Sequence, residues 1–314
     1  MLDQDDLHLG TGSHPGGVVW SAVCACGGGA SVRDAFAAAA FGYELTVRLA
    51  AALAPERVRW HPTAVAGIVG AAGAAALLLD TDPADAVAHA VSVAGGSPWA
   101  IVERTGTRFL HRAHAAASGV ACARAAAGLP GSRGGLESGR GAYAAVDRDA
   151  MLAPRASTCL EETSFRLHAA TGFAHAAIEA AQTLTPLEPG DVVRVTATVA
   201  PPAAIALASN PAPASDEERW WSIEHAVAVA LGAPKLCNRI ELAAGGEGWS
   251  ATVEVMLRDG EVRTATADGP HAASDDDLRA KWQRLTGSDG GAFFETLLSE
   301  RDGEPFAPLV AALP

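Results

Sequence analysis

The segment at residues 60–76 reads WHPTAVAGIVGAAGAAA, and this stretch decides the fold of the first half of the chain. Pro62 is well placed in the first turn of a helix, because its missing N–H would have no helical partner there. The residues behind it are almost all small, which lets neighbouring backbones approach closely. The pattern predicts a tightly packed helix. His61 stands at its N-terminus, near the positive end of the helix dipole, a position that suits a proton-transfer group facing an anion.

Helical patterns continue around this segment and later give way to strands. The first half predicts helices at 34–53, 63–79, 83–93 and 113–126, the third of them capped by Asp82. In the second half, β-branched and alternating runs predict strands at 192–199, 250–257 and 261–267, the last two joined as a hairpin. The remaining helices are expected at 173–183, 222–231, 275–285 and 292–298.

The order of these elements predicts an α+β fold with two domains. An all-helical domain is expected over 1–156 and a smaller α+β domain over 157–272, followed by C-terminal helices in 273–314 that can return to the helical domain. A chain of 314 residues is long enough for such a division. It is also long enough to form a core that needs no disulfide or metal support.

Composition argues against several classes of partner. The formal net charge of −13 disfavours nucleic acid, because neutralising phosphates requires Lys and Arg. The Ala-rich runs are interrupted by Gly, Asp, Arg and His, so no membrane span is expected. The five cysteines show neither a disulfide framework nor zinc spacing, which is typical of a reduced, cytoplasmic protein. No credible metal-ligand cluster appears in the sequence.

Acidic residues and a histidine gather near the N-terminus. Asp3, Asp5 and Asp6 precede His14, which is followed by proline and glycine. Carboxylates close to an imidazole can set its tautomer, raise its pKa or shuttle protons with it. The alternative interpretation is a solvated acidic terminus.

Two further segments combine histidine with other chemistry-bearing residues. His61 is a candidate for proton transfer, and the alternative is a histidine that packs structurally against Trp60. Residues 105–114 place Arg108 and His111 at a loop-to-helix junction. Arginine binds carboxylates with paired donors, and a helix start adds affinity for anions. A basic helix end on the surface is the alternative for this second segment.

The segment at 164–179 holds the last candidates. Arg166 and His168 precede a predicted helix and are placed to reach a ligand. His175 lies one turn before Glu179, so pairing with that carboxylate on the helix face is as good an interpretation as catalysis.

Together these segments resemble the MmgE/PrpD family, whose members include 2-methylcitrate dehydratase, cis-aconitate decarboxylase and iminodisuccinate epimerase. The resemblance covers nearly the whole chain. It is carried by LDQDD (2–6) with HPG (14–16), RWHPTA (59–64), GTRFLH (106–111), FR (165–166) with HAAIE (175–179), WSIEHAVA (221–228) and LRDG (257–260). It implies a helical domain with an α+β lid domain, a cofactor-free site between them, and a homodimer.

The chain departs from the family pattern at its cationic positions. The family's two lysines are Arg108 and Arg166 here, and arginine keeps the positive charge but does not exchange protons at neutral pH. In the segment that follows the second of these, the family's Tyr and Cys/His positions are His168 and Thr171. Carboxylate binding is expected to survive these changes.

Two departures concern the N-terminal region. Leu7 stands where the family usually has a threonine after its Asp-Asp pair. Family members also begin with further N-terminal helices, which the resemblance implies are lacking from the 1–156 domain of this chain.

The resemblance implies a cofactor-independent lyase or isomerase that moves a proton next to the carboxylate of a small organic acid. The expected type is a dehydratase or a decarboxylase, and the altered site points to bacterial specialised metabolism. The alternative is a non-catalytic or ligand-binding homologue that acts as a partner subunit.

Specific roles follow for the candidate residues. His61 or one of the N-terminal aspartates would take the proton, and His14 would act as the acid. Arg108 and Arg166 would clamp a substrate carboxylate. The other residues expected to contribute to substrate binding are His111, His168, Thr171 and His175.

Overall fold

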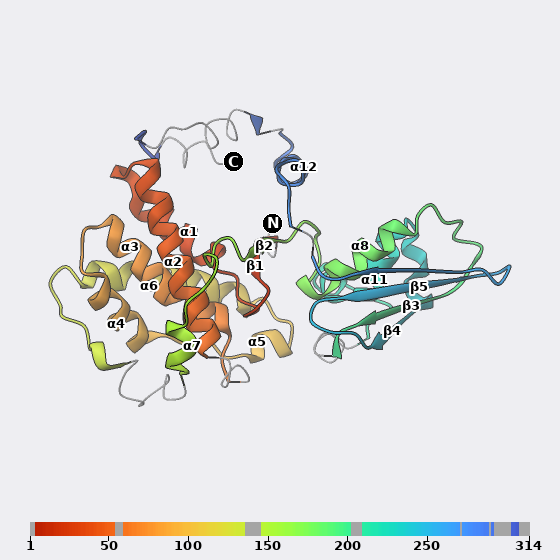
Figure 1. The fold of residues 1–314 in the computed structure, drawn as a ribbon, viewed down its shortest axis with the longest axis horizontal. Helices are drawn as coiled ribbons and strands as arrows, with labels where there is room; N and C mark the ends of the chain where they lie inside the picture. The colour runs from red at the N-terminus through yellow and green to blue at the C-terminus, as the bar shows by residue number, and fades with distance from the viewer. Residues whose placement is uncertain are drawn as a thin grey trace. The chain divides into compact units, whose positions relative to one another are not determined.

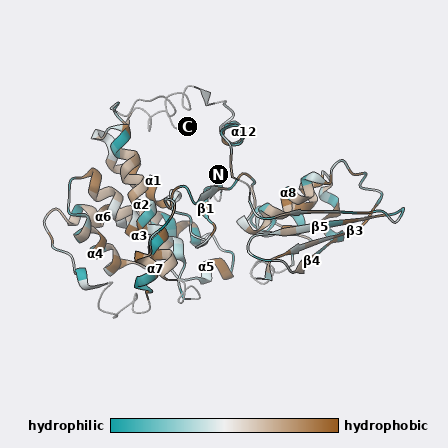
Figure 2. Cartoon of the chain, viewed as in Figure 1, coloured by the Kyte–Doolittle hydropathy of each residue, from teal (hydrophilic) through white to brown (hydrophobic). Residues whose placement is uncertain are grey.

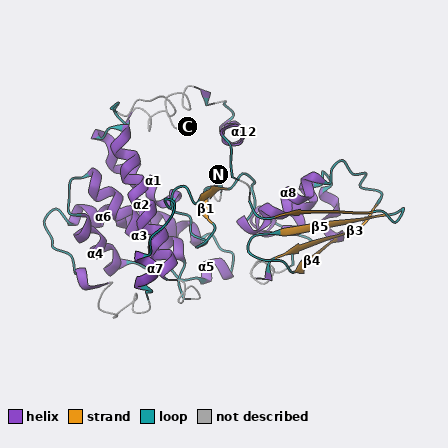
Figure 3. Cartoon of the chain, in the orientation of Figure 1, coloured by secondary structure: helices purple, strands orange, loops and turns teal. Residues whose placement is uncertain are grey.

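The computed structural model describes residues 4–53, 59–135, 146–201, 209–270, 272–288, 290–291 and 303–307. The chain has a mixed α+β fold and divides into two compact units (Figure 1). The helical unit comprises the described residues of 5–163 and of 278–314, and the α+β unit comprises Gln4 and the described residues of 164–277. Figure 3 shows the four-stranded sheet confined to the second of these units.

The helical unit is built around one central helix. Helix α3 contacts α1, α2, α4 and α6. The elements of this unit in chain order are β1 (Asp6–His8), α1 (Gly16–Cys26), α2 (Val32–Ala52), α3 (Pro62–Leu78), α4 (Pro83–Val93), α5 (Trp99–Val102), α6 (Thr107–Ala125) and α7 (Arg148–Leu152). Helix α12 (Asp275–Thr286) crosses the boundary between the units.

Helix α3 confirms the tightly packed helix expected from the sequence. Every residue from Thr63 to Ala76 is buried. The glycines let backbones touch, since a Cβ on Gly42 of α2 would lie 2.9 Å from the carbonyl oxygen of Gly70, and a Cβ on Gly119 of α6 would lie 2.9 Å from the backbone nitrogen of Ala72. Close packing without voids is what a protein core requires, and here small residues provide it. Figure 2 shows the hydrophobic residues of both units in brown.

Helix starts in this unit follow capping rules that the sequence shows. Asp82 accepts hydrogen bonds from the backbone nitrogens of Ala84 and Asp85, and Pro83 occupies the first turn, as expected. Helix α6 differs from the expectation, because it begins at Thr107 instead of Ala113. The loop-to-helix junction therefore lies at Gly106, and the basic residues that follow it are in the first turns of α6. The charged residues at the start of α6 interrupt the apolar pattern that would predict a helix there, and Gly106 has no side chain to cap the helix.

The α+β unit carries helices next to a four-stranded sheet of order β4-β3-β5-β6. Strand β3 pairs in parallel with β4 and antiparallel with β5, which pairs antiparallel with β6. Helix α8 contacts β3, β5 and β6. The elements are β2 (Thr163–Phe165) at the boundary, α8 (His175–Thr183), β3 (Val192–Val199), α10 (Asp216–Trp221), α11 (Ile223–Ala230), β4 (Ile240–Ala244), β5 (Ala251–Leu257) and β6 (Val262–Ala267).

The strand pattern was predictable except at one edge. The expected strands at 192–199, 250–257 and 261–267 are confirmed within a residue at either end. Strand β4 was not expected, because its sequence IELAA has no β-branched residue after Ile240. Strand propensity depends strongly on pairing. Here parallel pairing with β3, such as Val195 with Ile240, makes this segment a strand.

The described C-terminal residues 303–307 lie against the helical unit. The backbone nitrogen of Val32 donates to the carbonyl of Glu304 at 2.8 Å, and that of Phe306 donates to Ala30 at 2.9 Å. The Phe306 ring is buried in the same hydrophobic cluster as Val19 and Val23. The helix expected at 292–298 lies outside the described residues. Among the described helices, none combines the length and apolar character that crossing a bilayer requires.

Candidate functional site

The first group of candidate residues surrounds the turn between β1 and α1 in the helical unit. The two carboxylate oxygens of Asp6 accept from the backbone nitrogen of Gly16 at 3.0 and 2.8 Å, at the start of α1. The Tyr43 hydroxyl also hydrogen-bonds to Asp6. Burial, with the nearby carboxylate, raises the pKa of Tyr43, so the phenol stays neutral and can donate. Asp6 is therefore bound by the protein and serves as an anchor for the turn.

His14 is held from three directions. Its Nδ1 lies 2.6 Å from the carbonyl oxygen of Asp6 and 3.7 Å from a carboxylate oxygen of Asp5, and its backbone nitrogen donates to the Thr63 hydroxyl at 3.2 Å. A carbonyl oxygen can only accept, so Nδ1 must carry a proton. In the neutral ring, Nε2 is then the basic nitrogen. The structure thereby fixes the tautomer of this imidazole.

Arg112 completes this group from α6. Its Nη1 atom lies 2.9 Å from the second carboxylate oxygen of Asp5, and both side chains are mostly buried. Asp5 thus stands between a guanidinium and the His14 imidazole. An acidic residue placed between two basic groups stays ionised and orients both of them.

His61 is the residue immediately before α3. Its backbone carbonyl accepts from the nitrogens of Ala64 and Val65, and its own nitrogen donates to Gly96 at 3.0 Å. Its side chain makes no cap, so the ring is directed elsewhere. The His61 and His111 Nδ1 atoms lie 3.1 Å apart, and the ring centroids are 5.3 Å apart.

The environment of this histidine pair keeps it uncharged. Burial, followed by the nearby basic side chains, lowers the pKa of His61 to about 3. Burial, followed by the charge of His114, also lowers the pKa of His111. Neutral imidazoles at neutral pH are acceptors that can take up a proton.

Arg108 is buried in the first turn of α6. Its Nη1 donates to the carbonyl of Thr105 at 3.0 Å, and its Cζ lies 4.2 Å from the centre of the Phe109 ring. A guanidinium stacked on an aromatic ring is held in one orientation. Its charge contributes to the low pKa of His61.

The second group lies in the α+β unit. Arg166 is buried with its Cζ 5.2 Å from the Trp220 ring centre, and the backbone nitrogen of Thr171 donates to the carbonyl of Trp220 at 3.0 Å. The rings of His168 and His175 meet edge to face, with centroids 5.2 Å apart. Arg166 and Thr171 therefore contact Trp220, and the His168–His175 pair lies near enough to Arg166 for its charge to act on His175.

His175 does not behave as a surface helix residue. Its side chain is 1% exposed, and among the described residues its Nε2 has no hydrogen-bond partner. Burial, followed by the charges of His168 and Arg166, lowers its pKa to about 3. This burial argues against the simple pairing with Glu179 across a solvated helix face.

The candidates thus fall into two sets, one in each unit. The set in the helical unit comprises Asp5, Asp6, His14, His61, Arg108 and His111. The set in the α+β unit comprises Arg166, His168, Thr171 and His175. Asp3 lies outside the described residues. Within the described ranges, no three His, Cys, Asp or Glu side chains are grouped to hold a metal ion.

Three further residues contact the first set. Arg112 belongs to the basic segment 105–114 that the sequence singled out, but only Arg108 and His111 of that segment were expected to bind substrate. Tyr43 and Thr63 were not candidates, because their partners in the turn are far away in sequence.

Residues 1–155 match the family model of the MmgE/PrpD N-terminal domain. The matched range contains every candidate residue of the helical unit. No curated protein matches the chain.

Proposed function

The chain belongs to the MmgE/PrpD family, which includes lyases such as 2-methylcitrate dehydratase, and we propose that it is a cofactor-independent lyase or isomerase of a small organic acid. In this proposal it moves a proton at the carbon next to a carboxylate. The observation that carries the proposal is the neutral pair His61–His111 beside the ion-paired group of His14, Asp5 and Arg112.

His61 is the proposed base. Its low pKa keeps the ring unprotonated at neutral pH and so leaves a nitrogen available, although a pKa near the operating pH would make it a stronger base. The bond between the two Nδ1 atoms needs one donor and one acceptor. If His111 donates, His61 has its Nε2 protonated and its Nδ1 engaged; if His61 donates, its Nε2 is the basic atom. The second arrangement leaves His61 ready to act as a base through Nε2.

His14 is the proposed acid. Its Nδ1–H is bound to the Asp6 carbonyl, so proton exchange with a ligand takes place at Nε2. Asp5, 3.7 Å from Nδ1, stabilises the imidazolium electrostatically. A protonated Nε2 can deliver its proton to a leaving hydroxyl group or to carbon.

The proposed reaction balances without a cofactor. The base removes the proton from the carbon next to the carboxylate, and the C–H electron pair is delocalised into the carboxylate. In a dehydration this electron pair forms the new C=C bond, and the hydroxyl leaves as water with the proton from His14. In an isomerisation the proton returns to carbon. In a decarboxylation the C–CO₂ bond supplies the electron pair, and the acid protonates the carbon.

Arginine supplies the charge that such a reaction needs. Arg108 lies in the first turn of α6, where a carboxylate also meets the positive end of the helix dipole. In the α+β unit, Arg166 is the proposed carboxylate ligand, with His168, Thr171 and His175 as its neighbours in substrate binding.

A two-step experiment tests this function. Small di- and tricarboxylates, including malate, citrate and succinate, are screened for binding by thermal shift. Each is then incubated with the enzyme in D₂O and followed by proton NMR. We expect loss of an α-proton signal with at least one acid, and a fall of about a hundredfold to ten-thousandfold in His14→Gln and His61→Gln.

His114→Gln is the matched control. This histidine lies on α6 three residues from His111 but is exposed, and its replacement should leave the exchange rate unchanged. Wild-type rates in both test variants contradict the assignment. A carboxylate that binds the wild type with no exchange at carbon supports instead the ligand-binding, non-catalytic homologue.

A further inference from the structure

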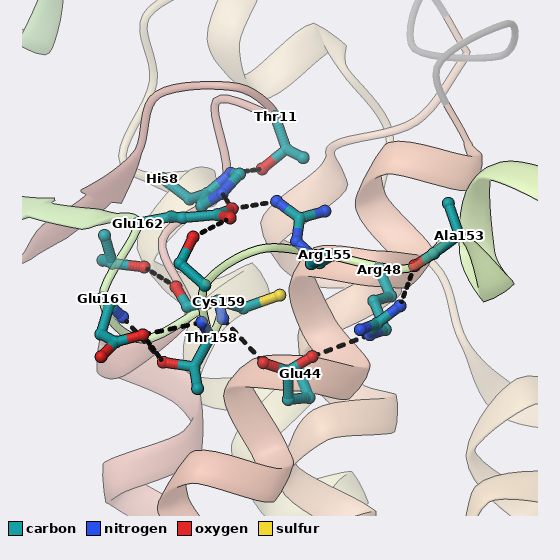
Figure 4. Close-up of polar contacts among 12 residues, drawn as sticks. His8, Thr11, Glu44, Arg48, Ala153, Arg155, Thr158, Cys159, Glu161 and Glu162 are labelled. Atoms are coloured by element: carbon teal, nitrogen blue, oxygen red, sulfur yellow. Dashed lines mark hydrogen bonds and ion pairs between the residues drawn. The ribbon is translucent and has the colours of Figure 1, made fainter.

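A second polar network lies in the helical unit outside the proposed catalytic groups. Figure 4 shows the His8 ring between the Thr11 hydroxyl and the Glu162 carboxylate. The His8 Nδ1 lies 3.0 Å from Thr11 Oγ1, and its Nε2 lies 3.2 Å from Glu162 Oε2. The His8 side chain is 5% exposed and that of Glu162 is 27% exposed, so the contact joins a buried ring to a partly exposed carboxylate.

The carboxylate fixes the direction of one hydrogen bond, and the others follow for a neutral ring. A carboxylate only accepts, so His8 Nε2 carries a proton towards Glu162. The neutral ring then accepts at Nδ1 from the Thr11 hydroxyl. That hydroxyl oxygen can in turn accept from Ser13, whose Oγ lies 2.7 Å away and whose backbone nitrogen donates at 3.3 Å.

The network closes the turn that carries His14. The backbone nitrogen of His8 donates to Ser13 at 2.9 Å, and Gly12 donates back to the His8 carbonyl at 2.8 Å. Asp6 begins this turn and His14 ends it, and the 2.6 Å contact between the Asp6 carbonyl and the His14 ring joins the two ends. The orientation of the His14 ring therefore depends on the shape of the turn.

Glu162 is itself fixed to the helical bundle. It accepts hydrogen bonds from Arg155 and, at 2.7 Å, from the Ser157 hydroxyl. The same segment is bound to α2, since the backbone nitrogen of Cys159 donates to Glu44 at 2.7 Å (Figure 4). Arg155 lowers the pKa of Glu162 to about 2, so His8 faces an ionised carboxylate at all pH values near neutrality.

Arg48 makes the second attachment of this segment to α2. It pairs with Glu44 at 2.7 Å and donates to the carbonyls of Met151 and Ala153 at 3.2 and 2.9 Å. The chain of contacts thus runs from α2 through the segment 151–162 and His8 to the turn before His14.

We propose that Glu162 and His8 are positioning residues that hold the turn between β1 and α1 and thereby set the orientation and tautomer of the His14 ring. Their use in catalysis rests on the function proposed above for His14. Their effect on the His14 ring does not, because it is a property of the folded protein.

Nitrogen-detected NMR of the imidazoles tests this proposal on the full chain. The variants are Glu162→Gln, which removes the charge, and Thr11→Val, which removes the hydroxyl but keeps the shape of the side chain. Glu161→Gln is the matched control, because Glu161 is exposed and its carboxylate hydrogen-bonds to Thr158 within the part of the chain that the structure describes. His14 signals are assigned by their loss in His14→Gln.

We expect both test variants to shift the His14 Nδ1 and Nε2 signals and to move the midpoint of its titration, while Glu161→Gln reproduces the wild type. If an acid shows exchange at carbon, kcat should fall about tenfold with a smaller change in KM, because misorientation affects the reacting geometry. Wild-type His14 signals in either folded test variant overturn the proposal. Should Glu162→Gln fail to fold, Thr11→Val decides, since it keeps the Glu162–Arg155 pair.

The two proposals fail separately. If no carboxylate shows proton exchange with the wild type, the proposed function is wrong, yet the His14 signals still report on positioning. If exchange occurs and the His14 signals do not respond to Glu162→Gln or Thr11→Val, the function stands and the positioning role is wrong.

Discussion

The Nδ1 atoms of His61 and His111 lie 3.1 Å apart, so the two imidazoles share a single proton between them. One Nδ1 donates and the other accepts, which requires the two rings to be opposite tautomers. Protonating both rings would place two N–H groups against each other and break the bond. The pair can therefore hold at most one added proton without rearranging, and burial, followed by the charge of His14 and then a charge on His111, lowers the pKa of His61.

The first prediction concerns stability as a function of pH. The pKa of His61 is about 3 in the folded protein, against 6.5 for an unperturbed histidine. Between these values the unfolded chain binds a proton that the folded protein does not, so the free energy of unfolding falls as the pH falls. Above pH 6.5 His61 is neutral in both the folded and the unfolded protein, so its burial no longer lowers the free energy of unfolding as the pH changes. Each such group contributes at most about 1.4 kcal/mol per pH unit.

Urea unfolding between pH 4 and pH 7 measures this effect. His61→Asn should make the free energy of unfolding depend less steeply on pH, by up to about one proton equivalent. His175 should still contribute to the remaining slope. Parallel curves for wild type and His61→Asn would show that His61 binds protons equally in the folded and unfolded states, which means that folding does not lower its pKa.

The second prediction concerns the ion pair of Asp5 and Arg112. The 2.9 Å contact is shielded from solvent, so removing one partner leaves the other charge without its counterion in a poorly solvated place. We expect the variants Asp5→Asn and Arg112→Gln to be non-additive. Their coupling in a double-mutant cycle should be about 0.5–3 kcal/mol in the free energy of unfolding. Additive effects would mean that the pair contributes little, as exposed pairs do.

Much of the fold could be predicted because the decisive signals are local. The alanine and glycine run of α3, the cap at Asp82 and the β-branched run of β3 each specify their own element. Strand β4 and the start of α6 could not be predicted in the same way. Strand β4 becomes a strand by pairing with β3. The start of α6 has a charged sequence of the kind expected in a loop, so its pattern does not predict a helix.

The candidate site could be predicted in its residues but not in its contacts. His14 and His61 stand out in the sequence because each precedes proline at a helix start. Nothing local indicates that His61 meets His111, fifty positions later, or that Asp6 is bound by Tyr43. Such contacts arise from packing of α2, α3 and α6, which brings distant segments together.

The third prediction tests the close packing of α3. A Cβ at Gly70 would overlap the Thr46 hydroxyl and the carbonyl of Gly42. Gly70→Ala should therefore destabilise the protein by about 1–3 kcal/mol or more, because a buried backbone contact cannot relax easily. Gly28→Ala is the control, since a Cβ there meets nothing within 4 Å. Thermal unfolding of the two variants compares them, and equal melting temperatures would disprove the close approach of α2 and α3.

The fourth prediction concerns Glu224, a carboxylate buried completely in α11 of the α+β unit. It accepts from the Ser209 hydroxyl at 2.6 Å and from the Asn210 backbone nitrogen at 3.0 Å. Glu224→Ala removes a buried acceptor, but Ser209 is exposed and Asn210 is half-buried, so both donors can reach water and the expected cost is about 1–3 kcal/mol of stability. The exposed Glu241→Ala should change stability by less than about 0.5 kcal/mol.

Hydrogen exchange locates the effect of the Glu224 substitution. The segment from Ser209 to Trp221 leads into Ser222, whose hydroxyl donates to the Asn210 carbonyl at 2.7 Å. Loss of Glu224 should therefore speed amide exchange in this segment, and through Trp220 it should loosen the stacking of Arg166. Amides of α3 in the helical unit should exchange at wild-type rates. Faster exchange in α3 as well would mean that the substitution unfolds the protein as a whole and that Glu224 has no local role.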